Sequence, residues 1–176
     1  MGISAAKVIL LSIFLFLGML LPGIVFQPKS SIEVWNINES DFPSNSSHPQ
    51  EKLAFLLNYA ILAPSSHNSQ PWKFNVSDDE ILLYADRSRW LSVADTDKRE
   101  MYISLGAALE NLILAAEHFG YNCTVSAFPG EEDLVALISL QEVIAAPSNA
   151  ALFPAITSRQ TNRNPYEMQA LSHAER

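Results

Sequence analysis

Residues 63–74, APSSHNSQPWKF, separate a helical sequence pattern from two strand patterns. Between Pro64 and Pro71 the segment is dense in small hydrogen-bonding side chains, and the prolines restrict the backbone at both ends. A polar loop that is shaped in advance loses less entropy when it binds a ligand. Trp72 and Phe74 then anchor the following strand in the core. The segment predicts a ligand-facing loop, although a helix C-terminal cap with an Asx or Ser/Thr turn would use the same residue types.

The residues before this loop have the pattern of an amphipathic helix over 50–63. Apolar residues recur there at the i, i+3, i+4, i+7, i+8 spacing that places them on one helical face: Leu53, Leu56, Leu57, Ala60 and Ile61. Pro49 suits the first turn, where no backbone donor is needed. Pro64 disfavours helical geometry in the residue before it, so we expect the helix to end there.

The residues after the loop predict two hairpins around one long helix. Residues 77–80 and Pro129-Gly130 have the composition of turns. The expected elements are strands at 72–76, 81–85, 122–128 and 133–140, a long helix at 97–119 and a short helix at 150–158. This order predicts an α+β fold with a mostly antiparallel sheet beside the long helix.

The ends of the long helix carry their own sequence features. Asp97 and Glu100 have the spacing of a capping box at its start. Gly120 suits the left-handed position that ends many helices. The small residues at 104–108 allow another element or a ligand to approach the helix backbone.

The chain before the helical pattern divides into three parts. A short tail, 1–7, precedes the uncharged run 8–28, and 29–49 is a linker rich in Ser, Asn and Pro that leads to the domain at 50–176. A bilayer core of ~30 Å needs ~20 apolar residues in a helix, so 8–28 is long enough to span it. We favour an uncleaved transmembrane helix or signal anchor over a cleaved signal peptide because no small-x-small cleavage pattern follows.

Either interpretation of the N-terminal run places the body of the protein outside the cytoplasm. The sequence predicts a single-pass membrane protein with an extracytoplasmic domain. Four Asn-x-Ser/Thr triplets fit export, although such triplets are common by chance: those at Asn38, Asn45, Asn75 and Asn122.

The composition argues against two classes of function. The formal net charge is -8, and no basic stripe of the kind that nucleic-acid binders carry is present. Cys123 is the one cysteine, and the four histidines are far apart in the sequence, so we predict neither an intrachain disulfide nor a metal site.

The loop and four later segments resemble one known family. Residues 64–72 resemble the nitroreductase-family pattern Pro-Ser-Ser-x-Asn-x-Gln-Pro-Trp, which lines a flavin mononucleotide (FMN) site. The later segments resemble the two-lobed, single-chain nitroreductase-like proteins of the Acg type: RSRWL at 87–91, DTDKRE at 95–100, ISLGAALENL at 103–112 and ITSRQTNR at 156–163. The resemblance covers about residues 51–168.

The resemblance implies an FMN-binding α+β fold with the flavin between two subunits or two lobes and the long helix at their interface. Carried over by position, the residues expected along the isoalloxazine ring are Pro64, Ser65, Ser66, Asn68 and Gln70. Those that match the Arg-x-Ser/Thr-x-Arg element at the ribityl phosphate are Arg159, Thr161 and Arg163.

Physical chemistry is consistent with the arginine assignment. A phosphate dianion is well held by forked, charge-assisted donors, which arginine supplies. Arg159 and Arg163 are four residues apart, so they would share a face if the segment were helical. A solvated surface pair is the alternative.

The family's chemistry is hydride transfer from NAD(P)H to the flavin and onward to a nitro or quinone-type acceptor. The flavin carries that chemistry, so no general acid or base is assigned to a side chain. We predict no Ser–His nucleophile among Ser65, Ser66 and His67, because adjacent side chains rarely point together and no Gly-x-Ser-x-Gly elbow is present.

The order of the motifs departs from that of single-lobe nitroreductases. Their arginine element precedes the Pro-Ser-Ser loop, whereas here it follows the first lobe, and no arginine precedes Glu51. We therefore expect one lobe and the start of a second. Three hypotheses follow: an FMN oxidoreductase that completes its site as a homodimer, a non-catalytic flavin-binding or sequestering protein, or a truncated lobe that is inactive without a partner.

Overall fold

The computed structural model describes residues 33–46, 48–143 and 151–165. The predicted N-terminal tail 1–7, the predicted transmembrane run 8–28 and residues 29–32 of the predicted linker lie outside these residues. In the described part, no helix is long and apolar enough to cross a membrane.

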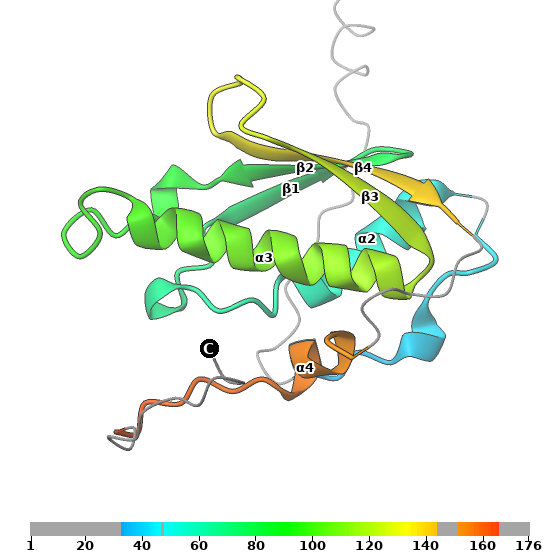
Figure 1. Cartoon of the computed structure of the whole chain (residues 1–176), viewed down its shortest axis with the longest axis horizontal. Coiled ribbons are helices and arrows are strands. Elements are labelled where there is room, and N and C mark those ends of the chain that lie inside the picture. Colours follow the sequence, from blue (N-terminus) through cyan, green and yellow to red (C-terminus); the bar gives the residue numbers. More distant parts are fainter. Residues whose placement is uncertain (1–32, 47, 144–150, 166–176) are drawn as a thin grey trace, which may run out of the picture. The chain divides into compact units, whose positions relative to one another are not determined.

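Three helices and four strands make up the described domain, with short 3-10 turns between them (Figure 1). In chain order they are α2 (Pro49–Ala60), β1 (Trp72–Val76), β2 (Glu80–Ala85), α3 (Arg99–His118), β3 (Tyr121–Ala127), β4 (Leu134–Glu142) and α4 (Phe153–Ser158). The predicted elements are present, with shifts of a few residues at their ends.

The four strands form one antiparallel sheet in the order β1-β2-β4-β3. The hairpin turn between β1 and β2 is closed by a bond from the Ser77 N–H to the Glu80 carbonyl, 2.9 Å long. Side chains alternate along β2, so that Ile81, Leu83 and Ala85 are buried while their neighbours are half-buried. The predicted α+β fold with an antiparallel sheet beside a long helix is confirmed.

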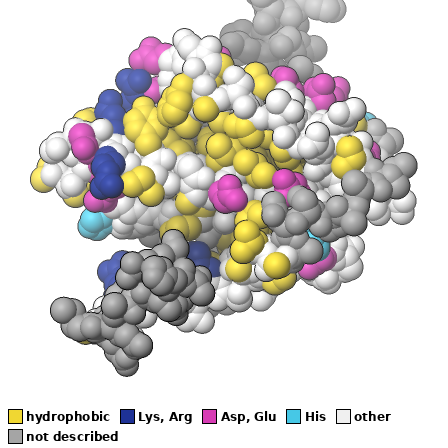
Figure 2. Space-filling model, in the orientation of Figure 1, with side chains coloured by type: hydrophobic (Ala, Val, Ile, Leu, Met, Phe, Trp, Pro, Cys, Tyr) yellow, Lys and Arg dark blue, Asp and Glu magenta, His cyan; other side chains and the backbone are white. Residues whose placement is uncertain are grey.

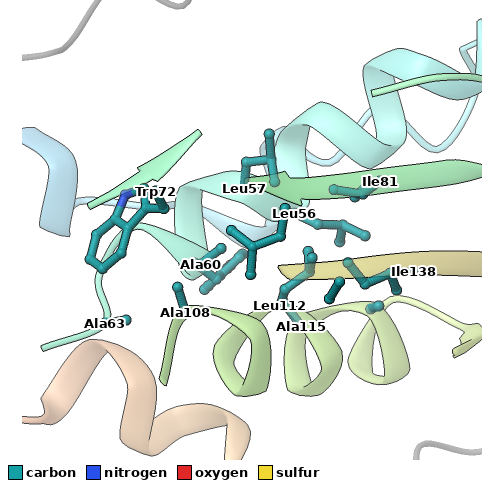
Figure 3. Close-up of a cluster of buried hydrophobic side chains, with 14 of the residues drawn as sticks. Leu56, Leu57, Ala60, Ala63, Trp72, Ile81, Ala108, Leu112, Ala115 and Ile138 are labelled. Carbon is teal, nitrogen blue, oxygen red and sulfur yellow. The ribbon is translucent and has the colours of Figure 1, made fainter. Parts of the chain in front are cut away.

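The core lies between the sheet and the helices α2 and α3, which pack against each other (Figure 3). Leu56 from α2, Leu112 from α3 and Ile138 from β4 are fully buried there. The predicted apolar stripe of α2 supplies this contact, except that Ile61 is only partly buried. Tyr59, which the periodicity did not select, is 1% exposed.

Helix α2 ends at Ala60, three residues before the end predicted from Pro64. The Leu62 and Ala63 N–H groups bond to the carbonyls three residues earlier, which tightens the last turn before the proline. Residues 61–63 therefore form a tight turn that connects α2 to the loop.

The start of α3 differs from the prediction. Lys98 has a left-handed backbone (φ 61°), and the helix begins at Arg99. The capping carboxylate belongs to the buried Asp95, whose oxygens accept the N–H groups of Glu100 and Met101 at 2.9 Å each. Asp97 accepts only the Arg99 N–H, at 3.2 Å. The predicted capping box of Asp97 and Glu100 is thus wrong, because the irregular loop before the helix folds Asp95 back onto its first turn.

The other end of α3 follows the prediction. Gly120 has φ +85° and donates its N–H to the Glu117 carbonyl at 3.2 Å. A side chain with a Cβ adopts this backbone only with strain, which explains glycine at this position.

Aromatic packing attaches α4 to the end of α3. The Phe153 ring stacks on the His118 imidazole with centroids 3.6 Å apart and an interplanar angle of 8°. Phe153 also contacts Tyr59 of α2, at 4.9 Å between ring centroids. The described part of the predicted helix 150–158 is helical from Phe153 onward, and Pro154 lies in its first turn, where it removes no helical bond. This contact places the residues after α4 next to the end of α2.

Candidate functional site

The loop between α2 and β1 has an unusual backbone. His67, Asn68 and Gln70 have φ of 51°, 56° and 49°, in the left-handed region that side chains with a Cβ rarely adopt. Three of the four residues 67–70 thus have a backbone conformation that costs free energy unless the surrounding structure stabilises it. Strained backbone conformations of this kind are concentrated at ligand-binding and active sites. The loop therefore has a fixed, non-random shape that the rest of the domain must enforce.

Internal hydrogen bonds fix part of that shape. The Ser65 hydroxyl accepts the Gln70 N–H at 3.0 Å, and the Ser65 carbonyl accepts the Asn68 N–H at 3.0 Å. The Ser66 carbonyl accepts the Ser69 N–H at 2.9 Å. The turn expected as the alternative to a ligand loop is therefore present, and the two interpretations are compatible with each other.

Helix α3 holds the loop from one side. The Ser66 N–H donates to the hydroxyl of Ser104 at 3.3 Å, and that hydroxyl donates to the Glu100 carbonyl at 2.8 Å. Ser104 is 3% exposed, so this is a buried contact between helix and loop. The small side chain of Ser104 permits the close approach that the composition of 104–108 predicted.

The segment after β2 holds the loop from the other side. The Arg89 guanidinium donates from Nη1 to the Ser69 carbonyl at 3.2 Å, and the Asp86 N–H donates to the Pro71 carbonyl at 2.8 Å. Asp86 also pairs with Lys73 at 3.0 Å and accepts from the Ser88 hydroxyl at 2.6 Å. Burial alone would raise the pKa of the Asp86 carboxyl, but the bonds from Ser88 and Lys73 bring that pKa below its ordinary value. Asp86 is therefore a buried anion that orders this side of the loop.

Two side chains from different elements meet the hydroxyl of Ser66. It donates to the carboxylate of Glu100, and it lies 3.2 Å from Nδ1 of His67. The expectation that the adjacent Ser66 and His67 would not point together is wrong. The left-handed backbone of His67 turns its imidazole back toward the preceding residue.

The remaining predicted ring-contacting side chains lie at the surface of the loop. Pro64 and Asn68 are exposed, and Ser65 and Gln70 are half-buried. The amide groups of Gln70 and Asn68 bond to each other at 3.3 Å. In the described part of the chain, the Asn68 NH₂ donors and the Gln70 carbonyl have no protein partner, so they remain available to a polar ligand.

Arg159 lies next to the start of the loop, and the helical arrangement considered for Arg159 and Arg163 is wrong. Helix α4 ends at Ser158, and Arg159 is extended, with φ −62° and ψ 135°. Its Nη2 donates to the Leu62 carbonyl at 3.0 Å, two residues before Pro64. The fold therefore brings the start of the predicted arginine element next to the start of the loop.

The other contacts of the Arg159 guanidinium come from the chain around it. Its Nη1 lies 3.4 Å from the Thr161 hydroxyl, and its Cζ lies 5.8 Å from the centre of the Trp35 ring. Its Nε is buried without a hydrogen-bond partner among the described residues. Thr161 and Arg163 are exposed. The three residues of this element are thus near one another in an extended segment, with only Arg159 packed against the domain.

Sequence reasoning did not select several residues that shape the site. Asp86, Arg89, Glu100 and Ser104 hold the loop, and all four lie within the segments 86–104. Arg89, Glu100 and Ser104 belong to the quoted family-like motifs, which was the available indication. Their roles depend on contacts with residues up to 38 positions away in the chain.

Comparisons with known proteins give a consistent picture of the family. No family model matches the sequence. The chain is 33% identical over 118 residues to the Mycobacterium tuberculosis protein named "Putative NAD(P)H nitroreductase Rv3131", covering 66% of this chain and 34% of that protein. It is 33% identical over 110 residues to "Putative NAD(P)H nitroreductase acg" of the same organism, covering 61% of this chain and 33% of that protein. These matches span about a third of the relatives' length.

A further relative and a solved structure are more distant. The Archaeoglobus fulgidus protein named "Putative NADH dehydrogenase/NAD(P)H nitroreductase" is 29% identical over 126 residues, covering 61% of this chain and 71% of that protein. The crystal structure of a Bacteroides thetaiotaomicron protein of the same name has a TM-score of 0.45 at 18% identity, covering 75% of this chain and 89% of the other. The two Mycobacterium tuberculosis matches cover 66% and 61% of this chain, and they support its relation to the nitroreductase family.

Proposed function

We propose that this chain binds FMN and acts as an oxidoreductase, which passes hydride from NAD(P)H through the flavin to a nitro or quinone-type acceptor. The observation that carries the proposal is the loop 64–70. Its strained backbone is held from both sides, and it presents amide and hydroxyl groups at the surface. Similarity to proteins named as NAD(P)H nitroreductases supports the assignment of flavin as the ligand.

The donor set of the loop fits the ring system of a flavin. Isoalloxazine carries carbonyl and ring-nitrogen acceptors along one edge and an N–H donor between them, so it needs both donors and acceptors opposite. The unpaired amide NH₂ of Asn68 and the unpaired carbonyl of Gln70 supply both kinds of group. Ser65 and Ser66 use their hydroxyls to shape the loop, and Pro64 offers an apolar surface at its start.

The basic element after α4 fits the phosphate of the same ligand. Arg159 has a buried Nε–H without a partner in the described part of the chain, and Arg163 and Thr161 are exposed nearby. An anion bound here would use donors that the protein leaves unpaired, which is favourable because buried unpaired donors are costly. Bound FMN would supply the hydride chemistry, while these residues would bind and orient it.

An exposed apolar surface beside α3 supports completion of the site by a second copy or a second lobe. Figure 2 shows hydrophobic side chains gathered on this face of the molecule, over α3 and the strands beside it. Tyr102, Ile103 and Phe128 are 39%, 57% and 64% exposed, and the Tyr102 and Phe128 rings are 5.8 Å apart. Large apolar patches of this kind mark interaction sites. We propose a homodimer or an association with a second lobe through this surface.

The first experiment is FMN titration of the purified full chain, followed by flavin fluorescence and absorbance. Binding should fall at least about tenfold in Asn68→Ala and in Arg159→Ala, because each change removes a hydrogen bond that a buried ligand needs. Asn75→Ala is the matched control, since Asn75 is an exposed amide on β1, outside the loop. A chain that takes up no FMN under any condition would overturn the proposal.

The second experiment separates turnover from binding. NADH or NADPH should bleach the bound flavin, and a nitroaromatic or a quinone should restore its absorbance. Binding without bleaching would instead support the non-catalytic flavin-binding alternative. Equilibrium ultracentrifugation of Ile103→Asp would test the interface, because a charge in a buried apolar contact should separate a dimer into monomers.

Membrane attachment through residues 8–28 remains a separate proposal. It is supported by the uncharged run at 8–28 and by the polar linker after it. Protease treatment of intact cells tests the outward orientation of the domain. A body that is protected until the membrane is opened would contradict that orientation.

A further inference from the structure

The hydroxyl of Ser66 stands in the middle of a chain of three polar side chains. Its neighbours are the Glu100 carboxylate, from the first turn of α3, and the His67 imidazole, from the loop. Glu100 and His67 are both exposed, whereas Ser66 is half-buried. A continuous line of hydrogen bonds therefore reaches from solvent to a residue that the proposed function places against the ligand.

The hydrogen bonds in this chain have a defined direction. A serine hydroxyl has one proton, and a carboxylate can only accept, so the Ser66 proton points to Glu100. The contact of 3.2 Å between Ser66 Oγ and His67 Nδ1 must then be a bond donated by Nδ1–H of the imidazole. The imidazole accordingly carries a proton on Nδ1. Protons can move along such a line by shifting each hydrogen one partner onward.

The fold holds these groups in place. The Ser66 N–H is bonded to Ser104 of α3, and the backbone of His67 is left-handed. Glu100 lies in the helical turn that Asp95 caps through the Glu100 N–H. Backbone hydrogen bonds thus fix Ser66 and Glu100, and the left-handed backbone of His67 sets the direction of its side chain.

The proposed reaction consumes protons as well as electrons. A quinone takes up two electrons and two protons to become a hydroquinone, and a nitro group takes up two of each to become a nitroso group and water. NAD(P)H supplies a hydride, which carries both electrons and one proton. The second proton must therefore come from solvent through the protein or directly from water.

We propose that Ser66, His67 and Glu100 form a proton relay that supplies this second proton to the reduced acceptor. The proposal rests on the proposed function, because it uses the placement of Ser66 against the flavin. The Ser66 hydroxyl proton passes to the Glu100 carboxylate, and the Glu100 carboxyl group gives its proton to the acceptor oxygen. The Ser66 hydroxyl is reprotonated from Nδ1–H of His67, and the imidazole takes up a proton from solvent. No further oxidant or reductant is needed.

The test compares acceptors that differ in their need for protons. Ferricyanide takes up one electron and no proton, whereas a benzoquinone takes up two electrons and two protons. General acid catalysis contributes about a hundredfold or more to rate, so Glu100→Gln and His67→Gln should slow reoxidation by benzoquinone about tenfold or more at saturating FMN. Reoxidation by ferricyanide and reduction by NAD(P)H should be unchanged.

A matched control comes from the other end of the domain. Ser46 and Glu51 form a serine–carboxylate hydrogen bond of 2.5 Å at the start of α2, where it takes no part in the loop. Glu51→Gln should leave the rates with both acceptors unchanged. Equal rates with benzoquinone in Glu100→Gln, His67→Gln and the unmodified protein would overturn the relay.

A second readout needs no bound flavin. Long-range ¹H–¹⁵N NMR of the imidazole rings in the full chain should show the Nδ1–H form for neutral His67, and Ser66→Ala should abolish that preference. The Nε2–H form in the unmodified protein would overturn the proposed direction of the hydrogen bonds. Absence of FMN binding would contradict the proposed function alone, whereas normal FMN binding with unchanged quinone rates would contradict only the relay.

Discussion

Replacement of Asp95 by alanine is expected to destabilise the domain more than any other single change at the start of α3. Asp95 is 4% exposed, and its two carboxylate oxygens accept the Glu100 and Met101 N–H groups at 2.9 Å each. The Asp95 carbonyl also accepts the Trp90 indole N–H, at 2.6 Å, and this bond holds the Asp95 backbone in place before the first turn of α3. The alanine variant loses the carboxylate and leaves two helix-terminal donors unpaired.

The size of the effect follows from these contacts. A hydrogen bond to a charged group contributes about 1.5–3 kcal/mol, and loss of a helix cap by mutation to alanine costs about 1 kcal/mol when it is exposed. Because the two bonds share one carboxylate they do not add in full, and we expect a loss of about 3 kcal/mol. For a domain of this size that corresponds to a fall in Tm of about 6–12 °C.

The assay is urea unfolding of the full chain, followed by circular dichroism at 222 nm. The control is Asp97→Ala, which removes one exposed bond to the Arg99 N–H, at 3.2 Å. That change should cost about 0.5 kcal/mol or less. The sequence pattern alone assigns the cap to Asp97, so equal losses, or a larger loss for Asp97→Ala, would refute the assignment of the cap to Asp95.

Three further predictions concern buried or packed side chains. Burial, and then the charge of Glu117, raises the pKa of the Cys123 thiol to about 11, so its alkylation by iodoacetamide at pH 8 should be about 100-fold slower than that of a free cysteine; an equal rate would show an exposed thiol. Burial, and then the Glu39 charge, raises the pKa of Tyr59 to about 12, whereas the unfolded phenol titrates near 10. The folded state thus keeps a proton that the unfolded state loses, and the free energy of unfolding should fall by about 3 kcal/mol between pH 10 and 12. In urea titrations, Tyr59→Phe should remove this pH dependence of the free energy of unfolding. The substitution should cost little stability at pH 7, because the hydroxyl has no partner among the described residues. Arg159→Ala removes the bond to the Leu62 carbonyl and the contact with the Trp35 ring, so it should cost about 1–3 kcal/mol and change Trp35 fluorescence; unchanged stability and emission would contradict this packing.

The arginine element shows where prediction from the sequence reached its limit. The spacing of Arg159 and Arg163 suggested a shared helical face, but α4 ends at Ser158. The reason is tertiary: Arg159 turns its guanidinium onto the carbonyl of Leu62, at the C-terminal end of α2, where a positive charge is favourable. A pattern of two arginines carries no information about such a distant acceptor.

The spacing of apolar residues, together with the residues that form turns and end helices, determined the secondary structure and the fold class. The apolar stripe at 53–60, the turn residues at 77–80 and the glycine at 120 each act through neighbours in the chain, so they can be recognised without the fold. The loop motif at 64–72 was likewise sufficient to indicate the family and the position of a candidate ligand site. These are local properties, which a sequence states directly.

Only the tertiary structure decided which residues hold that loop and what they could do together. Asp86, Arg89, Glu100 and Ser104 reach it from segments 15 to 38 residues away, and the left-handed backbone of His67 brings its imidazole onto Ser66. Hydrogen bonds depend on distances of about 3 Å and on direction, and chain separation does not determine either. The sequence therefore located the candidate site, whereas packing of α3 and of the segment after β2 against the loop determined its shape and its proposed proton relay.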